Sequence, residues 1–251
     1  MNTTVLVIPC FNEAARLNGD AFTAFLQRHP HIHCLFVNDG STDTTAGILD
    51  SLAQKSTNIS VLHLKTNSGK AEAVRQGFIK AFAMKASAVG FIDADLAAPL
   101  ECVPELEHYL IEPRTEIVIG ARVALLGRRI QRDETRHFCG RVFATLASRV
   151  LHLRIYDTQC GAKLFRVTDR LKKVFAAPFS VKWIFDVEIL ARFMITEKDG
   201  YTLVRDICVE HPLQTWTDIK GSKLRSRDFF ISTLDLWKIY VLIQKNTLPP
   251  Y

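Results

Sequence analysis

The sequence predicts an α/β domain with a mostly parallel central sheet flanked by helices and an amphipathic helix at the C-terminal end. In the first half, short apolar runs alternate with helical patterns, as expected of parallel strands joined by crossover helices. The runs are continuously apolar, which indicates strands covered on both faces. A chain of 251 residues, 48% of them hydrophobic, suits one domain with a sizeable core.

Five strands are predicted from runs rich in Val, Ile, Leu and Phe. They cover residues 5–9, 34–39, 60–64, 88–93 and 116–121. The helices expected between them lie near residues 20–28, 43–54, 70–85 and 102–110. Each helix begins near a capping or turn residue such as Asp43 or Ser68. Ligands of such open sheets bind beyond the carboxyl ends of the strands.

The regular alternation ends after Arg122. A basic linker is followed by a helix, a short polar segment, a second helix, a strand and the amphipathic C-terminal helix. These five elements are expected at residues 134–152, 157–165, 185–193, 203–210 and 224–244.

The net charge of +6 favours an anionic partner, such as nucleic acid, a phosphorylated ligand or an acidic membrane surface. One basic cluster spans residues 220–227. The other is a series of arginines in the middle third: Arg122, Arg128, Arg129, Arg132, Arg136, Arg141, Arg149 and Arg154. Neither cluster carries a nucleic-acid-binding motif, so we do not expect a nucleic-acid partner.

The sequence contains neither a long apolar run nor a signal-peptide pattern. A transmembrane helix needs roughly 18 consecutive apolar residues, and a signal peptide needs a basic start before an apolar stretch. We therefore expect a cytoplasmic protein. The six cysteines are scattered without a CxxC pair, which indicates neither a zinc site nor a disulfide framework.

The segment FIDADL, residues 91–96, ends a strand in two carboxylates. Strand geometry points Asp93 and Asp95 the same way, and two such oxygen ligands can hold Mg²⁺ or Mn²⁺ against a diphosphate. A solvated turn after a strand is the alternative interpretation.

Four fragments in order resemble the family 2 glycosyltransferases of GT-A (Rossmann-like) fold. They are VLVIPCFNEAARL (5–17), VNDGSTDTT (37–45), NSGKAEAVRQGF (67–78) and FIDADL (91–96). Later fragments resemble the branch that makes polyprenyl-phosphate sugars, and dolichyl-phosphate β-glucosyltransferases in particular. These are DTQCGAKLFR (157–166), WIFDVEIL (183–190) and VEHPLQTWTDIKGSKLR (209–225).

The resemblance implies one GT-A domain over residues 1–251, with a nucleotide-sugar half (1–122) and an acceptor half (123–251). The implied activity is inverting transfer of a sugar, with glucose expected, from a UDP-sugar to a polyprenyl phosphate. Two alternatives stay open: transfer to a hydroxyl of a glycan or small molecule, and non-catalytic binding of a nucleotide sugar.

On the donor side, the resemblance implies that Pro9 and Glu13 line the nucleoside pocket and that Asp39 hydrogen-bonds the base. Lys70, at a helix start, would lie close to the pyrophosphate or the base. Alternatively, Asp39 caps a turn, and Lys70 is an exposed lysine at a helix start.

The resemblance further implies a metal-dependent enzyme whose metal ligands are Asp93 and Asp95. Asp93 would contact the ribose or a metal-bound water. Asp95 would ligate the divalent ion, Mg²⁺ or Mn²⁺, that bridges the two phosphates and acts as a Lewis acid on the leaving group.

On the acceptor side, Arg122 and Arg136 would hold the lipid phosphate, because guanidinium groups bind phosphate in a bidentate fork. Asp157 and Gln159 would position the sugar or the acceptor, and Asp186 would orient the site. The alternatives are a solvated basic face for the arginines and backbone or arginine partners for the other residues.

The two long helices of the second half carry apolar residues at helical spacing, among them Phe138 and Val142 in the first and Trp237 in the second. Such helices are typical of a membrane interface, and core packing with a basic outer face is equally compatible. We therefore expect peripheral contact with the cytoplasmic membrane face, where a polyprenyl phosphate would be met.

Overall fold

The computed structural model describes residues 3–131, 134–196, 200–218 and 226–247. Within them, a seven-stranded sheet has the order β3-β2-β1-β4-β7-β5-β8. Its strands are β1 (Thr4–Cys10), β2 (Ile32–Asp39), β3 (Ile59–Leu64), β4 (Ala88–Ile92), β5 (Ile117–Ala121), β7 (Ala162–Arg166) and β8 (Cys208–Pro212). All five predicted strands of the first half are present, and the α/β prediction is confirmed.

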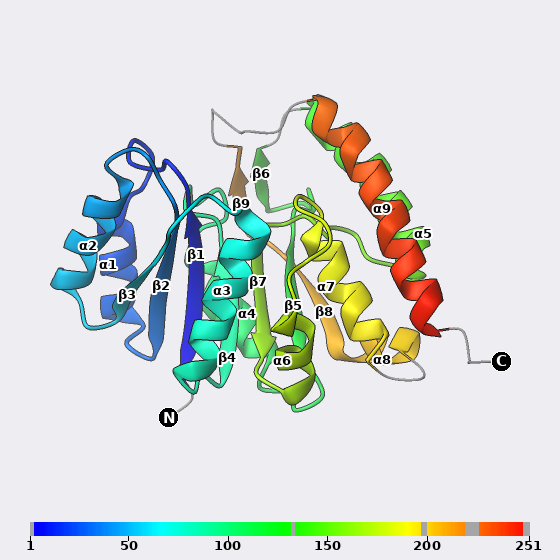
Figure 1. Cartoon of the computed structure of the whole chain (residues 1–251), viewed down its shortest axis with the longest axis horizontal. Coiled ribbons are helices and arrows are strands. Elements are labelled where there is room, and N and C mark those ends of the chain that lie inside the picture. Colours follow the sequence, from blue (N-terminus) through cyan, green and yellow to red (C-terminus); the bar gives the residue numbers. More distant parts are fainter. Residues whose placement is uncertain (1–2, 132–133, 197–199, 219–225, 248–251) are drawn as a thin grey trace.

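The crossover helices of the first half lie where the sequence predicts them. They are α1 (Gly19–Arg28), α2 (Thr45–Lys55), α3 (Lys70–Ala83) and α4 (Cys102–Tyr109). One face of the sheet packs against α1, α2 and α4, and the other packs against α3 and the later helices (Figure 1). The inner strands β1, β2, β4, β5 and β7 are buried on both faces because side chains of both orientations enter a core, as the continuous apolar runs of the first half indicate.

Strand β7 is antiparallel to both of its neighbours, β4 and β5. It forms from the second half of the DTQCGAKLF segment, for which no strand was predicted. The register pairs Ile92 with Ala162 and Phe91 with Lys163. The start of β7 therefore lies beside the end of β4, and residues 157–161 lie next to the Asp-x-Asp segment.

The second half supplies helices α5 (Glu134–Leu151), α6 (Asp169–Ala176), α7 (Phe185–Met194), α8 (Gly200–Ile207) and α9 (Ser226–Thr247). The strand predicted at residues 203–210 is wrong in its first part, because helix α8 extends to Ile207 and β8 begins at Cys208. Val204 and Ile207 are buried while Arg205 is exposed, which is a helical pattern that the apolar run conceals.

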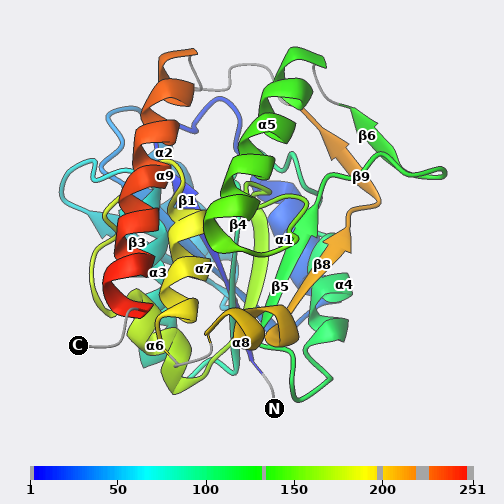
Figure 2. The same ribbon diagram turned by 90° about the vertical axis from the view of Figure 1, so that its right-hand side faces the viewer.

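Helices α5 and α9 lie side by side on the α3 face of the sheet (Figures 1 and 2). In α9, Leu236, Ile239 and Ile243 pack into the core, which confirms the amphipathic C-terminal helix. No helix within the described ranges is long and apolar enough to cross a bilayer. Two further short strands, β6 (Arg129–Gln131) and β9 (Thr215–Thr217), pair in parallel. Only a basic linker was expected at β6, and no element was expected at β9.

Candidate active site

The predicted donor-side residues gather at the carboxyl edge of three adjacent strands. Pro9 lies near the end of β1, Asp39 ends β2, and Asp93 directly follows β4. Strand β1 pairs in parallel with both β2 and β4, so these ends lie next to one another. The edge is the one at which ligands of open α/β sheets bind.

Glu13 lies in the loop after β1 and is paired with Arg16. The two side chains form a bidentate contact, with Nη2 to Oε1 at 2.6 Å and Nε to Oε2 at 2.9 Å. The hydrogen bonds that Arg16 donates to Glu13, together with the charges of Glu13 and Asp95, outweigh burial and raise the pKa of Arg16 above its ordinary value. Arg16 thus brings a fixed positive charge toward the Asp-x-Asp segment. It stands in the fragment VLVIPCFNEAARL, but no role was predicted for it.

The Asp39 carboxylate joins β2 to the start of α3. Its oxygens accept hydrogen bonds from the backbone N–H of Ser68 at 2.7 Å and of Gly69 at 2.8 Å. Gly69 has a φ of +91°, a left-handed conformation that favours glycine. Burial raises the pKa of Asp39, and the two backbone hydrogen bonds offset only part of that rise. Asp39 therefore shapes the loop that presents Lys70, and its contact with a base stays a prediction.

Lys70 begins α3 and forms an ion pair with Asp93, with Nζ 2.5 Å from Oδ1. Its ammonium also lies 5.9 Å from the centre of the Phe91 ring, within range of a cation–π contact. Burial lowers the pKa of Lys70, but the negative charges of Asp93, Asp186 and Asp95 outweigh it and leave the pKa raised. Lys70 is therefore a permanent cation beside the Asp-x-Asp segment.

Asp95 is half-buried and accepts a hydrogen bond from the Ala97 N–H at 3.1 Å. Burial and the negative charge of Asp93 raise its pKa above the ordinary value. A divalent cation at this position would relieve that repulsion, so the donor set fits Mg²⁺ or Mn²⁺. Among the described residues no three His, Cys, Asp or Glu side chains converge on one point. Two carboxylates completed by substrate phosphates are the usual ligands of such ions.

Gly161 allows the Asp-x-Asp segment to pack against the start of β7. A Cβ atom at Gly161 would collide with the Asp93 carboxylate. Asp93 is thus held between the Lys70 ammonium on one side and the backbone of Gly161 on the other. The DTQCGAKLF and FIDADL segments, about 70 residues apart in the sequence, form one surface.

On the acceptor side, Arg122 and Asp157 are partners of each other. Arg122 donates to Asp157 from Nε at 2.6 Å, from Nη2 at 2.8 Å and from its backbone N–H at 3.1 Å. The Arg122 guanidinium also lies 4.8 Å from the centre of the Trp216 ring. Burial would raise the pKa of Asp157, but the charge and hydrogen bonds of Arg122 lower it to about 2. The pair is therefore charged at neutral pH.

Asp186, predicted to orient the site, is paired with Lys163 of β7. The Lys163 side chain is 2% exposed, and its ammonium donates to the Cys160 carbonyl at 2.6 Å and lies 5.1 Å from the centre of the Phe91 ring. No role was predicted for Lys163. The signal in the sequence was a lysine within the apolar part of the strand, between Ala162 and Leu164.

The backbone N–H of Gln159 donates a hydrogen bond to the Asp157 carboxylate at 3.1 Å. Its amide nitrogen Nε2 is a buried donor without a hydrogen-bond partner in the described part of the chain. The side chain of Arg136 lies outside the described residues, so its predicted contact with a phosphate stays a prediction.

The geometry of the site agrees with the protein family that the sequence of the chain matches. The family model described as Glycosyl transferase family 2 matches residues 5–170. The chain belongs to this family.

Curated relatives of the chain include dolichyl-phosphate beta-glucosyltransferases. The one from Trichomonas vaginalis is 30% identical over 95% of this chain and 71% of the relative, and the one from Dictyostelium discoideum is 29% identical over 95% and 73%. The resemblance to this family and to its dolichyl-phosphate β-glucosyltransferase branch is thereby confirmed.

Among solved structures, glucosyl-3-phosphoglycerate synthase from Mycobacterium tuberculosis, in complex with Mn²⁺, UDP and glucosyl-3-phosphoglycerate, aligns with a TM-score of 0.68. The alignment covers 99% of this chain and 81% of that chain at 17% sequence identity. This similarity confirms the predicted GT-A fold.

Replacing Gly161 with alanine tests the contact with Asp93. We expect Gly161→Ala to fold, because the carboxylate at the end of a flexible side chain can move away, and to lose at least about tenfold in Mn²⁺-dependent UDP affinity by calorimetry. Gly47→Ala is the matched control, since a Cβ there meets nothing within 4 Å. A UDP affinity of Gly161→Ala equal to that of Gly47→Ala would contradict a role of the Gly161–Asp93 contact in binding.

Replacing Asp157 with asparagine tests the Arg122 pair. Because its folded pKa of about 2 lies below the ordinary value of 3.8, ionised Asp157 stabilises the fold above pH 3.8 and loses this effect as the pH falls through 2. We expect Asp157→Asn to lower the free energy of unfolding by about 3 kcal/mol at pH 7. In urea titrations, the difference in free energy of unfolding between the wild type and Asp157→Asn should narrow below pH 4. A difference that stays constant with pH would exclude the Arg122–Asp157 pair as its source. Asp169→Asn, at an exposed carboxylate, is the control.

Proposed function

We propose that the chain is an inverting glucosyltransferase that moves glucose from UDP-glucose to a dolichyl-type polyprenyl phosphate. The observation that supports this proposal most is that charged side chains of the donor side and of the acceptor side lie on either side of the β4–β7 junction. Lys70, Asp93 and Asp95 stand on the β4 side, and the Arg122–Asp157 pair stands beside the start of β7. The dolichyl-phosphate beta-glucosyltransferases among its relatives support the choice of sugar and acceptor.

The donor side suits a nucleoside diphosphate sugar. Asp95, with Asp93, would hold the divalent ion, and the bound ion would supply charge neutralisation to the departing diphosphate. Lys70 would add a positive charge where the diphosphate lies, and Arg16 would balance the carboxylate of Glu13. The loop that Asp39 orders would bring the nucleoside against Pro9.

The acceptor side suits a nucleophile that needs placement more than deprotonation. A phosphate monoester with a second pKa of about 6 is largely dianionic at neutral pH. The Arg122 guanidinium has five N–H donors, and the Asp157 carboxylate takes one from Nε and one from Nη2. Arg122 would hold the lipid phosphate with its other N–H donors, while Asp157 fixes the plane of the guanidinium. The phosphate oxygen then attacks the anomeric carbon opposite the leaving diphosphate, which inverts the configuration.

Contact with the membrane is proposed for the outer face of α5 and α9. Phe138 on α5 is 70% exposed and Trp237 on α9 is 66% exposed. Leu234 and Tyr240 are exposed at matching spacing along α9, so the large apolar side chains form a stripe. Aromatic side chains on amphipathic helices favour the boundary between lipid headgroups and acyl chains. We therefore place the protein peripherally on the cytoplasmic membrane face.

Assay of the purified protein with UDP-glucose and Mn²⁺ or Mg²⁺ tests the reaction. We expect mass spectrometry to detect glucosyl phosphate lipid when dolichyl phosphate is supplied, and no product from glycan acceptors. Asp95→Ala should lower the rate more than about a hundredfold while the circular dichroism spectrum is retained. Product on the glycan alone would reject the lipid acceptor, and near-normal turnover of Asp95→Ala would reject its role toward the metal.

Sedimentation with vesicles tests the α5–α9 surface. We expect Trp237→Ala to weaken binding to vesicles of phosphatidylcholine with phosphatidylserine by about tenfold, since a buried aromatic contributes about 1.5–3 kcal/mol. Ile111→Ala is the control, because Ile111 is 73% exposed but follows α4 on the opposite face of the sheet. Equal binding of the two variants would exclude this surface.

A further inference from the structure

We infer that Arg141 and Glu210 are positioning residues that hold the peptide group between Tyr156 and Asp157, and through it the Asp157 carboxylate against Arg122. Neither residue is assigned a role by the resemblance or by the reaction described above. The inference rests on the proposed function, because it concerns the geometry of the acceptor-side pair.

Glu210 holds the N–H side of the segment. From β8, its carboxylate accepts hydrogen bonds from the Tyr156 N–H at 2.8 and 2.9 Å and from the Asp157 N–H at 2.8 Å. Two consecutive amides thus donate their only protons to one carboxylate. A hydrogen bond to a charged acceptor is about twice as strong as one between neutral groups.

Arg141 holds the carbonyl side. From α5, its Nη1 donates to the Tyr156 carbonyl oxygen at 2.9 Å, and its guanidinium carbon lies 3.8 Å from the centre of the Tyr156 ring. The Tyr156 carbonyl and the Asp157 N–H belong to the same planar peptide group. Arg141 and Glu210 therefore bind the carbonyl and the N–H of the same peptide group and fix its orientation.

The placement of this peptide group determines where the Asp157 side chain lies, because the peptide nitrogen is bonded to the Asp157 Cα. Asp157 uses both carboxylate oxygens toward Arg122, with contacts of 2.6 and 2.8 Å. Displacement of this peptide group would move the Asp157 Cα, which is bonded to its nitrogen, and carry the carboxylate away from the guanidinium. Arg122 would then lose the partner that fixes its plane for the acceptor phosphate.

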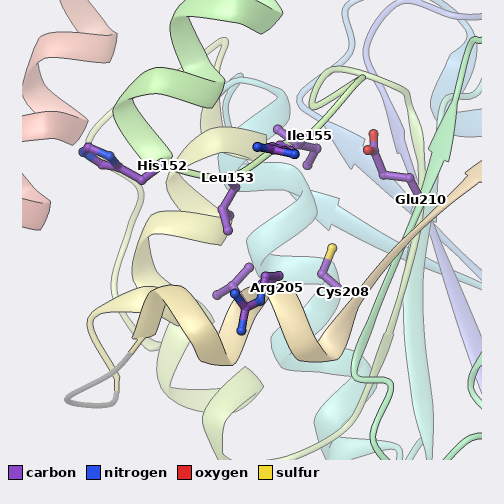
Figure 3. A pocket seen from close by; sticks show the side chains of 8 residues that line it. His152, Leu153, Ile155, Arg205, Cys208 and Glu210 are labelled. Carbon is purple, nitrogen blue, oxygen red and sulfur yellow. The ribbon is translucent and has the colours of Figure 1, made fainter.

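Packing surrounds the segment incompletely, because part of it borders a cavity. A cavity of about 590 Å³ lies there between the end of α5, α8 and β8 (Figure 3). Leu153 and Ile155, which precede the held peptide, line it together with Glu210. Ile155 also belongs to the hydrophobic core, so the polar contacts of Arg141 and Glu210 act together with packing to restrain the segment.

Arg141 also connects the site to the proposed membrane surface. It lies on α5 between Phe138 and Thr145, one residue before Val142, and both Phe138 and Val142 are exposed apolar residues. A shift of α5 at a lipid surface would thus be passed to the Tyr156 carbonyl.

Steady-state kinetics of Arg141→Ala, Arg141→Lys and Glu210→Gln test the inference, with Arg149→Ala as the matched control on an exposed position of α5. For Arg141→Ala we expect kcat to fall by about ten- to a hundredfold and the KM for dolichyl phosphate to rise, because small misplacements of positioning groups have effects of this size. The Kd of UDP with Mn²⁺ should stay at the wild-type value.

The conservative variants separate positioning from general stability. Arg141→Lys keeps a donor for the Tyr156 carbonyl but loses the planar contact with the ring, so it should recover part of the rate lost in Arg141→Ala. Glu210→Gln keeps one acceptor oxygen but loses the charge and the second acceptor, so its kcat should fall, though less than that of Arg141→Ala.

The inference is overturned if folded Arg141→Ala and Glu210→Gln match Arg149→Ala in kcat and in acceptor KM. It is also overturned if UDP affinity and Tm fall together with the rate, which would indicate a structural role. A wild-type protein that makes no glucosyl lipid is a separate result, since it rejects the proposed function itself.

Discussion

Antiparallel pairing of β7 with β4 is the contact on which the site depends. Its register places Ala162 opposite Ile92 and Lys163 opposite Phe91. As a consequence, Gly161 meets the Asp93 carboxylate, and the loop that carries Asp157 lies at the end of β4. Without this inserted strand, the nucleotide-binding edge and the acceptor-side residues would belong to separate parts of the chain.

Alternating charges stabilise that junction. Lys163 pairs with Asp186, and Lys70 pairs with Asp93 while also experiencing the charge of Asp186. Both ammonium groups lie over the Phe91 ring. Each buried or half-buried carboxylate thus has a cation nearby, which is what allows so many charges to lie at the edge of a core. The arrangement leaves Asp95, with its raised pKa, as the carboxylate that a divalent ion would neutralise most effectively.

The parts of the fold with strong periodicity could be predicted from the sequence. Strands β1 to β5 are continuous apolar runs, and the Asp-x-Asp segment after β4 carries its own chemistry. Strand β7 was not predicted because its five residues AKLFR include a lysine and an arginine, and its direction depends on pairing with a strand about 70 residues earlier. The second half of α8 was predicted as strand because Leu203 and Val204 suit either period.

Pairings between distant residues could not be predicted, and they alter how several site residues are understood. Arg122 was assigned to the acceptor phosphate and Asp157 to positioning of the sugar or the acceptor, yet they are bound to each other across 35 positions. Glu13 and Asp39 were assigned to the nucleoside, yet each already has a partner in the chain, Arg16 and the backbone of residues 68–69. Sequence spacing indicates which residues reach the same edge, whereas their partners follow from three-dimensional packing.

The central claim is that donor and acceptor phosphates meet across the β4–β7 junction. A crystal structure with Mn²⁺, UDP and a short-chain polyprenyl phosphate measures this directly. The account predicts the ion at about 2.0–2.2 Å from an Asp95 oxygen, and the lipid phosphate within about 3 Å of the Arg122 guanidinium. A lipid phosphate bound away from Arg122, with the Arg122–Asp157 pair unchanged, would contradict it.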